Sequence, residues 1–193
     1  MEMNSTFDIV NSQLIYTYDG VEIFIKTLQN CFDDRVYLCF TRRKPKAEAD
    51  DRSGYPSTDY NFFFPLEVGR KFLEELPATI DFVKHQLTKE VKSASEGYFT
   101  KICERLLATD NNIEYYNGIK QSNQYGSYQI YLSHPNPNSP TDKVVDFSLT
   151  LRGANAAKYY LPHILIAAEN FLNSRNPTEP KTIPLERATT DAV

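Results

Sequence analysis

Apolar residues in this chain alternate as in β-strands and then recur at helical spacing, and this order occurs twice. The first half has four β-rich runs, at residues 14–18, 21–25, 35–41 and 60–64. An apolar stripe at helical spacing follows from Leu66 to Leu87. The second half has β-rich runs at residues 113–116, 119–121, 128–133 and 144–149, and then a helical stripe over 153–174. The pattern predicts an α+β protein in which a ββββα unit is repeated.

Two pairs of similar segments support an internal duplication. Residues 15–21 resemble residues 113–119, and each contains a turn signal, Asp19-Gly20 or Asn117-Gly118. Residues 66–77 match residues 151–162 with the same internal spacing and the same Leu-Pro end. Because proline removes a helical hydrogen bond, we expect either a kink or two shorter helices at Pro77 and Pro162.

These matches predict the division of the chain. We expect a first ββββα repeat in residues 1–92, a second in residues 113–175 and a disordered tail in residues 176–193. The connecting segment, residues 93–112, carries an apolar stripe that predicts a helix, formed by Phe99, Ile102, Cys103, Leu106 and Leu107. Residues 42–59 are charged and contain prolines and a glycine, which predicts a long loop.

Composition narrows the class of protein. A formal net charge of -4 argues against nucleic-acid binding by bulk electrostatics alone. No apolar run reaches the roughly 18 residues that span a bilayer, no secretory signal is visible, and the three cysteines have no metal-ligand spacing. We therefore expect an intracellular protein, cytoplasmic or associated with the nucleoid or nucleus, that does not enter membranes.

Catalytic motifs are not visible in the sequence. His85, His134 and His163 fall in different predicted elements, and no HExxH, nucleophile-elbow, P-loop or dinucleotide-binding pattern occurs. The paired carboxylates Asp33-Asp34 and Asp50-Asp51 fall in predicted turns. We therefore expect a protein that is not an enzyme and that carries no cofactor and no metal.

Basic and aromatic residues are interleaved on the predicted strands. Rings on a sheet can stack unpaired bases while cations contact phosphates, so this mixture indicates single-stranded nucleic-acid binding. An alternative for the tyrosines is packing in the core. The predicted binding residues are Tyr16, Tyr18, Lys26, Arg35, Tyr37, Arg42, Arg43, Lys44, Lys46, Tyr116, Lys120 and Tyr128. We expect Arg42, Arg43 and Lys44 to be exposed on the same side as Tyr16, Tyr18 and Tyr37.

The duplicated four-strand-plus-helix unit, with its Leu-Pro helix, resembles a group of single-stranded nucleic-acid-binding proteins. The group comprises the positive-cofactor transcriptional coactivators, the plant Whirly proteins and the PUR-repeat proteins. The resemblance covers most of residues 14–174 as topology, and no short signature motif of these families is intact. It implies two repeats packed through their helices as an intramolecular pseudo-dimer, with curved sheets that bind single-stranded DNA or RNA. This chain departs from the group in its acidic overall charge.

Two functions follow as hypotheses. The first is a non-catalytic accessory factor for transcription, replication or recombination that binds single-stranded DNA or RNA. The second is a protein-interaction or assembly module with the same fold and no nucleic-acid surface. Either could dock on a larger protein machine, and the pseudo-dimer could assemble further.

Overall fold

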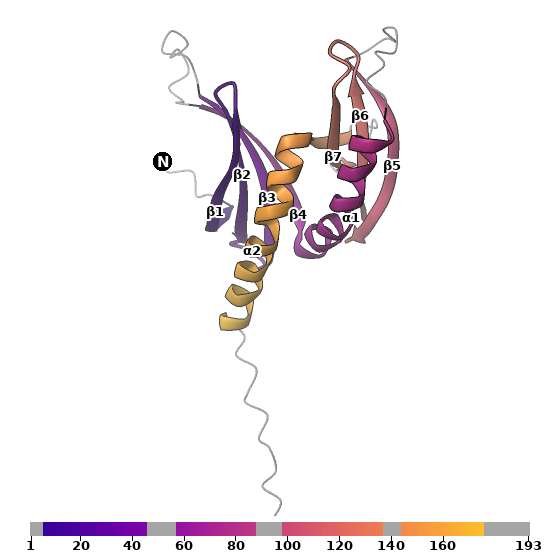
Figure 1. Ribbon diagram of the computed structural model, residues 1–193. Helices are drawn as coiled ribbons and strands as arrows, with labels where there is room; N and C mark the ends of the chain where they lie inside the picture. Colours follow the sequence, from indigo (N-terminus) through magenta and orange to yellow (C-terminus); the bar gives the residue numbers. More distant parts are fainter. Residues whose placement is uncertain (1–5, 46–56, 88–97, 137–143, 176–193) are drawn as a thin grey trace, which may run out of the picture.

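The computed structural model describes residues 6–45, 57–87, 98–136 and 144–175 (Figure 1). The first unit consists of β1 (Phe7–Tyr18), β2 (Val21–Asn30), β3 (Val36–Pro45), β4 (Ser57–Pro65) and α1 (Leu66–His85). The second consists of β5 (Phe99–Asp110), β6 (Ile113–Ser122), β7 (Tyr128–Pro135), β8 (Val144–Thr150) and α2 (Leu151–Arg175). Each unit has one antiparallel sheet whose strands lie side by side in chain order. The prediction of an α+β fold with two ββββα units is therefore confirmed.

The two units agree in details of their backbones. Their first strands both have 12 residues, and their second strands both have 10. When the two sequences are aligned so that Phe7 matches Phe99, both β-bulges of β1 align with the two bulges of β5. In the same alignment, the hydrogen bond from the Asn30 amide to the Arg35 carbonyl corresponds to the bond from the Ser122 amide to the Ser127 carbonyl, and each is 2.8 Å long. From the fourth strand of each unit onward, the two sequences align with Leu66 matched to Leu151.

This register corrects one of the two sequence matches. The turn at Asp19-Gly20 has positive φ at both residues, 46° and 71°, as predicted. Its counterpart is Asn111-Asn112, with φ of 48° and 63°, so the match of residues 15–21 with 113–119 is wrong. Asn117-Gly118 is not a turn but lies in the middle of β6. Asparagine tolerates the left-handed region, so the actual turn carried no glycine to mark it.

The predicted connecting helix is also wrong, because its apolar residues belong to β5. The register of β5 with β6 shifts between Lys101 and Cys103 and again between Leu106 and Ala108. Each shift is a bulge that inserts one extra residue into the strand. Two bulges change the two-residue alternation of a strand into spacings of three and four residues, which resemble those of a helix.

Other boundaries differ less from the prediction. β1 begins at Phe7, earlier than expected, and both ends of the predicted loop 42–59 belong to strands β3 and β4. Each helix continues through its proline, Pro77 or Pro162, so the alternative of two shorter helices is wrong. The predicted tail and residues 46–56, 88–97 and 137–143 lie outside the described residues.

The core is shared by the two units. The helices contact each other, and each also contacts the sheet of the other unit, α2 against β1 and β2 and α1 against β5 (Figure 1). Leu76 and Leu161 occupy equivalent helix positions, and both are 0% exposed. Phe40 of the first sheet stacks on Phe147 of the second, with ring centroids 5.2 Å apart. One continuous cluster of buried residues therefore spans both units.

Candidate functional site

The two sheets meet where side chains of the first unit reach the edge strand of the second. The hydroxyl of Tyr60 in β4 donates to the carbonyl oxygen of Asp146 at 2.7 Å. The guanidinium of Arg42 in β3 donates to the carbonyl oxygen of Ser148 at 3.4 Å. Edge strands present backbone groups without a partner strand, and these two side chains satisfy two of them on β8. This contact fixes the position of β8 relative to the first sheet.

A groove runs along this junction. It consists of two adjoining hollows of about 360 and 730 Å³, and we call the two together the junction groove. Four residues line both hollows: Tyr16, Tyr18, Gln129 and Thr150. The smaller hollow is also lined by Arg42, Tyr60, Phe99, Lys120, Asp146 and Ser148, and the larger one by Asp19, Lys84, Tyr125, Tyr128 and Arg152. Both units therefore contribute to each hollow.

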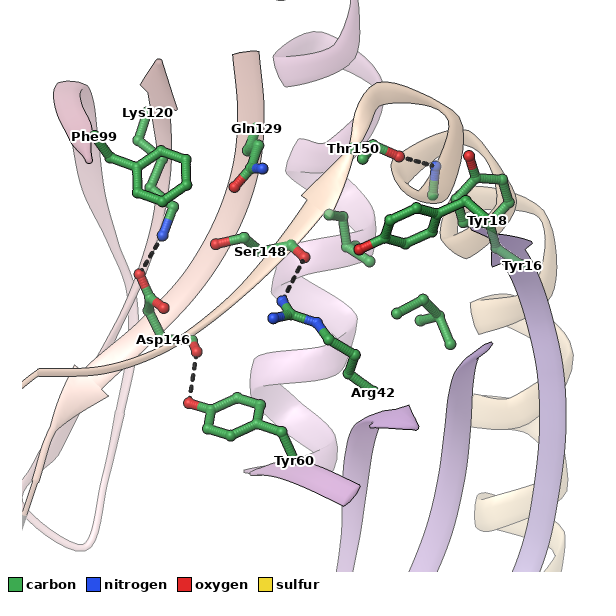
Figure 2. A pocket seen from close by; sticks show the side chains of 13 residues that line it. Tyr16, Tyr18, Arg42, Tyr60, Phe99, Lys120, Gln129, Asp146, Ser148 and Thr150 are labelled. Carbon is green, nitrogen blue, oxygen red and sulfur yellow. Dashed lines mark hydrogen bonds and ion pairs between the residues drawn. The ribbon is translucent and has the colours of Figure 1, made fainter. Parts of the chain in front are cut away.

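Aromatic rings form much of the wall of the smaller hollow (Figure 2). Tyr16 and Tyr18 lie on the same face of β1, and their rings stack with centroids 5.6 Å apart. Phe99 lies across the hollow and covers the ammonium group of Lys120, 4.7 Å from the ring centroid. Burial and then the negative charge of Asp146 raise the pKa of Tyr60, which keeps this phenol protonated as a hydrogen-bond donor.

The polar groups of the smaller hollow are only partly satisfied. Lys120 pairs with the carboxylate of Asp146 at 2.6 Å. The Nε atom of Arg42 and the hydroxyl of Ser148 are buried without a hydrogen-bond partner in the described structure. Buried polar groups normally have partners, so these two mark the wall of this hollow as a place with unused hydrogen-bonding capacity.

The larger hollow carries positive charge beside accessible rings. Lys84 lies in the last turn of α1 and Arg152 in the first turn of α2, and both are exposed. Among the described residues, neither of these cations has an ion-pair partner, whereas Asp19 is the one acidic residue that lines this hollow. Tyr125 is 74% exposed, so its ring is accessible for stacking.

The structure divides the predicted binding residues among several surfaces. Tyr16, Tyr18, Arg42 and Lys120 line the smaller hollow and Tyr128 the larger one. The register places Lys26, Tyr37 and Arg43 on the face of the first sheet opposite to Arg42. Tyr116 lies on the same face of the second sheet as Lys120 but lines neither hollow. Arg35 lies exposed before β3, Lys44 lies exposed at the end of β3, and Lys46 lies outside the described residues.

The predicted single surface is therefore wrong in its geometry. Arg42 pairs across the sheet with Ile23 and Tyr60, whereas Arg43 pairs with Glu22 and Asp59. Successive residues of a strand point to opposite faces, so neighbouring arginines cannot serve one surface. The guanidinium of Arg43 donates a hydrogen bond of 3.1 Å to the carboxylate of Asp59, and this bond raises the pKa of Arg43.

Sequence reasoning missed most of the groove. The lining residues that it did not select include Tyr60, Lys84, Phe99, Tyr125, Gln129, Asp146, Ser148 and Arg152. A signal was present in the correct alignment of the repeats. There, Gln129 and Ser148 stand where the first unit has Tyr37 and Phe63, so small polar groups replace large rings in one unit only.

Within the part of the chain that the structure describes, no helix has the length and apolar character of a membrane span. In that same part, histidine, cysteine and carboxylate side chains do not come together in a group that could hold a metal ion. Comparisons with known protein families and with curated protein sequences find no match to this chain.

Proposed function

We propose that this protein binds single-stranded DNA or RNA in the junction groove, as a non-catalytic accessory factor in transcription, replication or recombination. The observation that carries the proposal is the lining of the groove. Stackable rings stand beside Lys84 and Arg152, cations without ion-pair partners in the described structure, although the whole chain has a net charge of -4. A basic, aromatic groove in an acidic protein concentrates the chemistry of nucleic-acid binding at one place.

Single strands fit this chemistry better than duplexes do. Stacking of a base on an aromatic side chain contributes about 1–3 kcal/mol, and it requires the face of an unpaired base. Tyr16, Tyr18 and Tyr125 present such rings, while the cations nearby can contact the phosphates. Paired bases stack on one another inside a duplex and cannot reach these rings.

The groove also supports an intramolecular pseudo-dimer as the working form of the protein. Each helix packs against the sheet of the other unit, and the ion pair of Arg70 in α1 with Glu169 in α2, 2.9 Å long, joins the two helices. Tyr18 from the first unit and Tyr128 from the second line the same hollow. The binding surface therefore depends on the docking of the two units. We place its action inside the cell, where single-stranded intermediates of these processes occur.

Fluorescence anisotropy with labelled single-stranded DNA, single-stranded RNA and duplex DNA of equal length tests the proposal. We expect single strands to bind more tightly than duplex and binding to weaken as salt is raised. Lys84→Ala or Arg152→Ala should lower the slope of affinity against salt by about one each, because each removes one phosphate contact. The matched controls are Lys71→Ala on α1 and Lys158→Ala on α2, which lie outside the groove.

A second variant tests whether the strand binds in the smaller hollow by filling that hollow, without changing any charge. Ser148→Phe places in the smaller hollow the residue type that the first unit has at the equivalent position, Phe63. We expect it to exclude a strand from this hollow and to leave the melting temperature close to that of the parent. Equal binding by the parent and by all of these variants would show that the strand binds elsewhere, and no binding at low salt would reject the function.

A protein-interaction or assembly module remains the second candidate function. The observation that favours it is on α2, where Tyr159 and Ile166 are 66% and 56% exposed outside the groove. Such residues could dock on a larger protein machine or on a second copy. This candidate predicts no binding of any strand and a loss of association on Tyr159→Ser/Ile166→Ser, measured by light scattering for self-association.

A further inference from the structure

The smaller hollow contains a partly exposed carboxylate held next to a less accessible ammonium group. Lys120 and Asp146 are joined at 2.6 Å, and their side chains are 13% and 41% exposed. Phe99 and Tyr131 cover the ammonium group, with ring centroids 4.7 and 5.4 Å away. A ligand that enters this hollow therefore meets the carboxylate more readily than the ammonium.

An exposed carboxylate is unfavourable for a phosphate and favourable for a group that donates hydrogen bonds. Phosphate oxygens and carboxylate oxygens are both negatively charged acceptors and repel each other. The stacked pair Tyr16–Tyr18 and the ring of Phe99 instead form walls suited to the flat face of a nucleobase (Figure 2). The smaller hollow therefore has the features of a base-binding site.

Guanine has the hydrogen-bonding edge that matches these groups. Its N1–H and N2–H₂ are adjacent donors that a single carboxylate can accept together, and its O6 and N7 are acceptors for a cationic side chain. Cytosine and adenine each present one amino group, and thymine and uracil present one ring N–H. Gln129, whose carboxamide has no partner within the described structure, lines the same hollow and can contact the remaining polar atoms.

We propose that the smaller hollow is a guanine-selective subsite, in which Asp146 accepts hydrogen bonds from the base and Lys120 and Gln129 complete its recognition. This inference rests on the proposed binding of single strands. It divides the groove into two parts with different tasks. Lys84 and Arg152 of the larger hollow contact phosphates of any sequence, whereas Asp146 reads one base.

The test compares oligothymidine strands of one length that carry a single guanine, adenine or cytosine, or no substitution, by anisotropy at fixed salt. The parent should bind the strand with guanine about tenfold more tightly than the other three. Asp146→Asn should remove this preference, so that the strand with guanine binds no more tightly than the other three. Lys84→Ala should weaken all four strands by the same factor.

The fold offers a reason to expect that Asp146→Asn folds. The equivalent residue of the first unit is Asn61, in the same position of its own edge strand. Asp59→Asn, on the opposite face of the first sheet, is the matched carboxylate control and should keep the guanine preference. If Asp146→Asn melts at a lower temperature than the parent, Gln129→Leu serves as the second variant and should reduce the preference for guanine.

The outcomes separate this inference from the proposed function. Equal affinity of the parent for all four strands overturns the guanine subsite and leaves strand binding in place. If no strand binds, titration with guanosine monophosphate shows whether the guanine subsite exists without the strand-binding function. Binding that is lost in Asp146→Asn would support the subsite while rejecting the strand-binding function, and no binding would overturn both.

Discussion

The junction groove has a counterpart among the described residues when the two ββββα units are aligned, and the two places differ in both shape and charge. When equivalent residues of the two units are matched, the residues that line the larger hollow correspond to residues that line a crevice of about 430 Å³. In that crevice Asp33, Asp34 and Asp110 stand where the groove has Tyr125, Gly126 and Tyr18. The crevice therefore carries three carboxylates beside Arg35 and Tyr37, whereas Asp19 is the one carboxylate among the tyrosines and cations of the larger hollow.

Within the described residues, aromatic rings of the first unit occupy the place that corresponds to the smaller hollow. At its counterpart, Phe7 stacks on Phe63 with centroids 5.0 Å apart and meets Tyr37 edge-on at 6.1 Å. Phe99 is equivalent to Phe7, but Ser148 and Gln129 replace the two ring partners. The space that three rings fill in the first unit is consequently open in the second.

This difference separates what a duplicated fold must keep from what it can change. Bulges, turns and most buried helix positions coincide in the two units, although the side chains at these positions differ in size, as Phe72 and Ala157 do. Residues that line the crevices contribute less to packing and can diverge. Binding chemistry at one crevice then requires no change of the backbone.

The largest expected effect concerns what the two units share. Leu76→Ala and Leu161→Ala should each lower the free energy of unfolding by about 2–5 kcal/mol, because each leaves a cavity in the common core. Urea denaturation followed by circular dichroism measures the change. Both variants should unfold in one transition that involves the whole chain. A second transition in which one unit unfolds alone would show that the core is not shared.

A smaller effect tests a difference between the sheets. Gly118 in β6 pairs directly with Tyr131 in the neighbouring strand β7, and a methyl group at Gly118 would lie only 2.7 Å from Cε1 of that ring. The first unit has Lys26 and Cys39 at these two positions, a large residue where the second has a small one. Gly118→Ala should therefore cost about 1–3 kcal/mol of unfolding free energy. Lys26→Ala, its matched control, removes atoms without a clash.

Thermal melting and a double-mutant cycle check this explanation. In a Tyr131→Cys background, which reproduces the pairing partner of the first unit, Gly118→Ala should cost less than it does in the parent. An unchanged cost would mean that the ring of Tyr131 is not what excludes the methyl group.

The smallest effect is a dependence on pH that only the second unit should show. Partial burial opposes ionisation of Glu104, but hydrogen bonds from Lys101 and Tyr131 outweigh it and lower the pKa of this carboxyl. A lowered pKa in the folded state stabilises the protein above the ordinary glutamate pKa, and this stability is lost as the pH falls through the folded-state value. The equivalent residue of β1 is Ser12, which does not titrate.

Melting temperatures of the parent and of Glu104→Gln, measured from neutral to acidic pH, test this contribution. The free energies of unfolding of the two proteins should differ by less than about 1 kcal/mol at neutral pH, because the ion pair of Glu104 with Lys101 is largely at the surface. Their melting temperatures should become equal in acid. A constant difference at every pH would assign the effect to packing. Glu114→Gln, on the neighbouring strand β6, is the matched control.

The sequence by itself determined the class of fold, the duplication of the helices and, in the first unit, the order of the elements. Leu66 to Pro77 and Leu151 to Pro162 recur with the same spacing because both segments bury the same face in the same core. Periodicity was sufficient wherever a strand or helix was regular. It failed in β5, where two bulges gave a strand the apolar spacing of a helix.

Only the tertiary structure decided where a binding surface could form. The sequence places Arg42 beside Arg43, but the pleat of β3 separates them onto opposite faces. Conversely, Tyr18 and Tyr128 are far apart in the chain, and the docking of the two units brings them to one hollow. Local periodicity records which residues are buried within each unit. The meeting of an edge strand with the opposite sheet depends on packing between units, which no local pattern encodes.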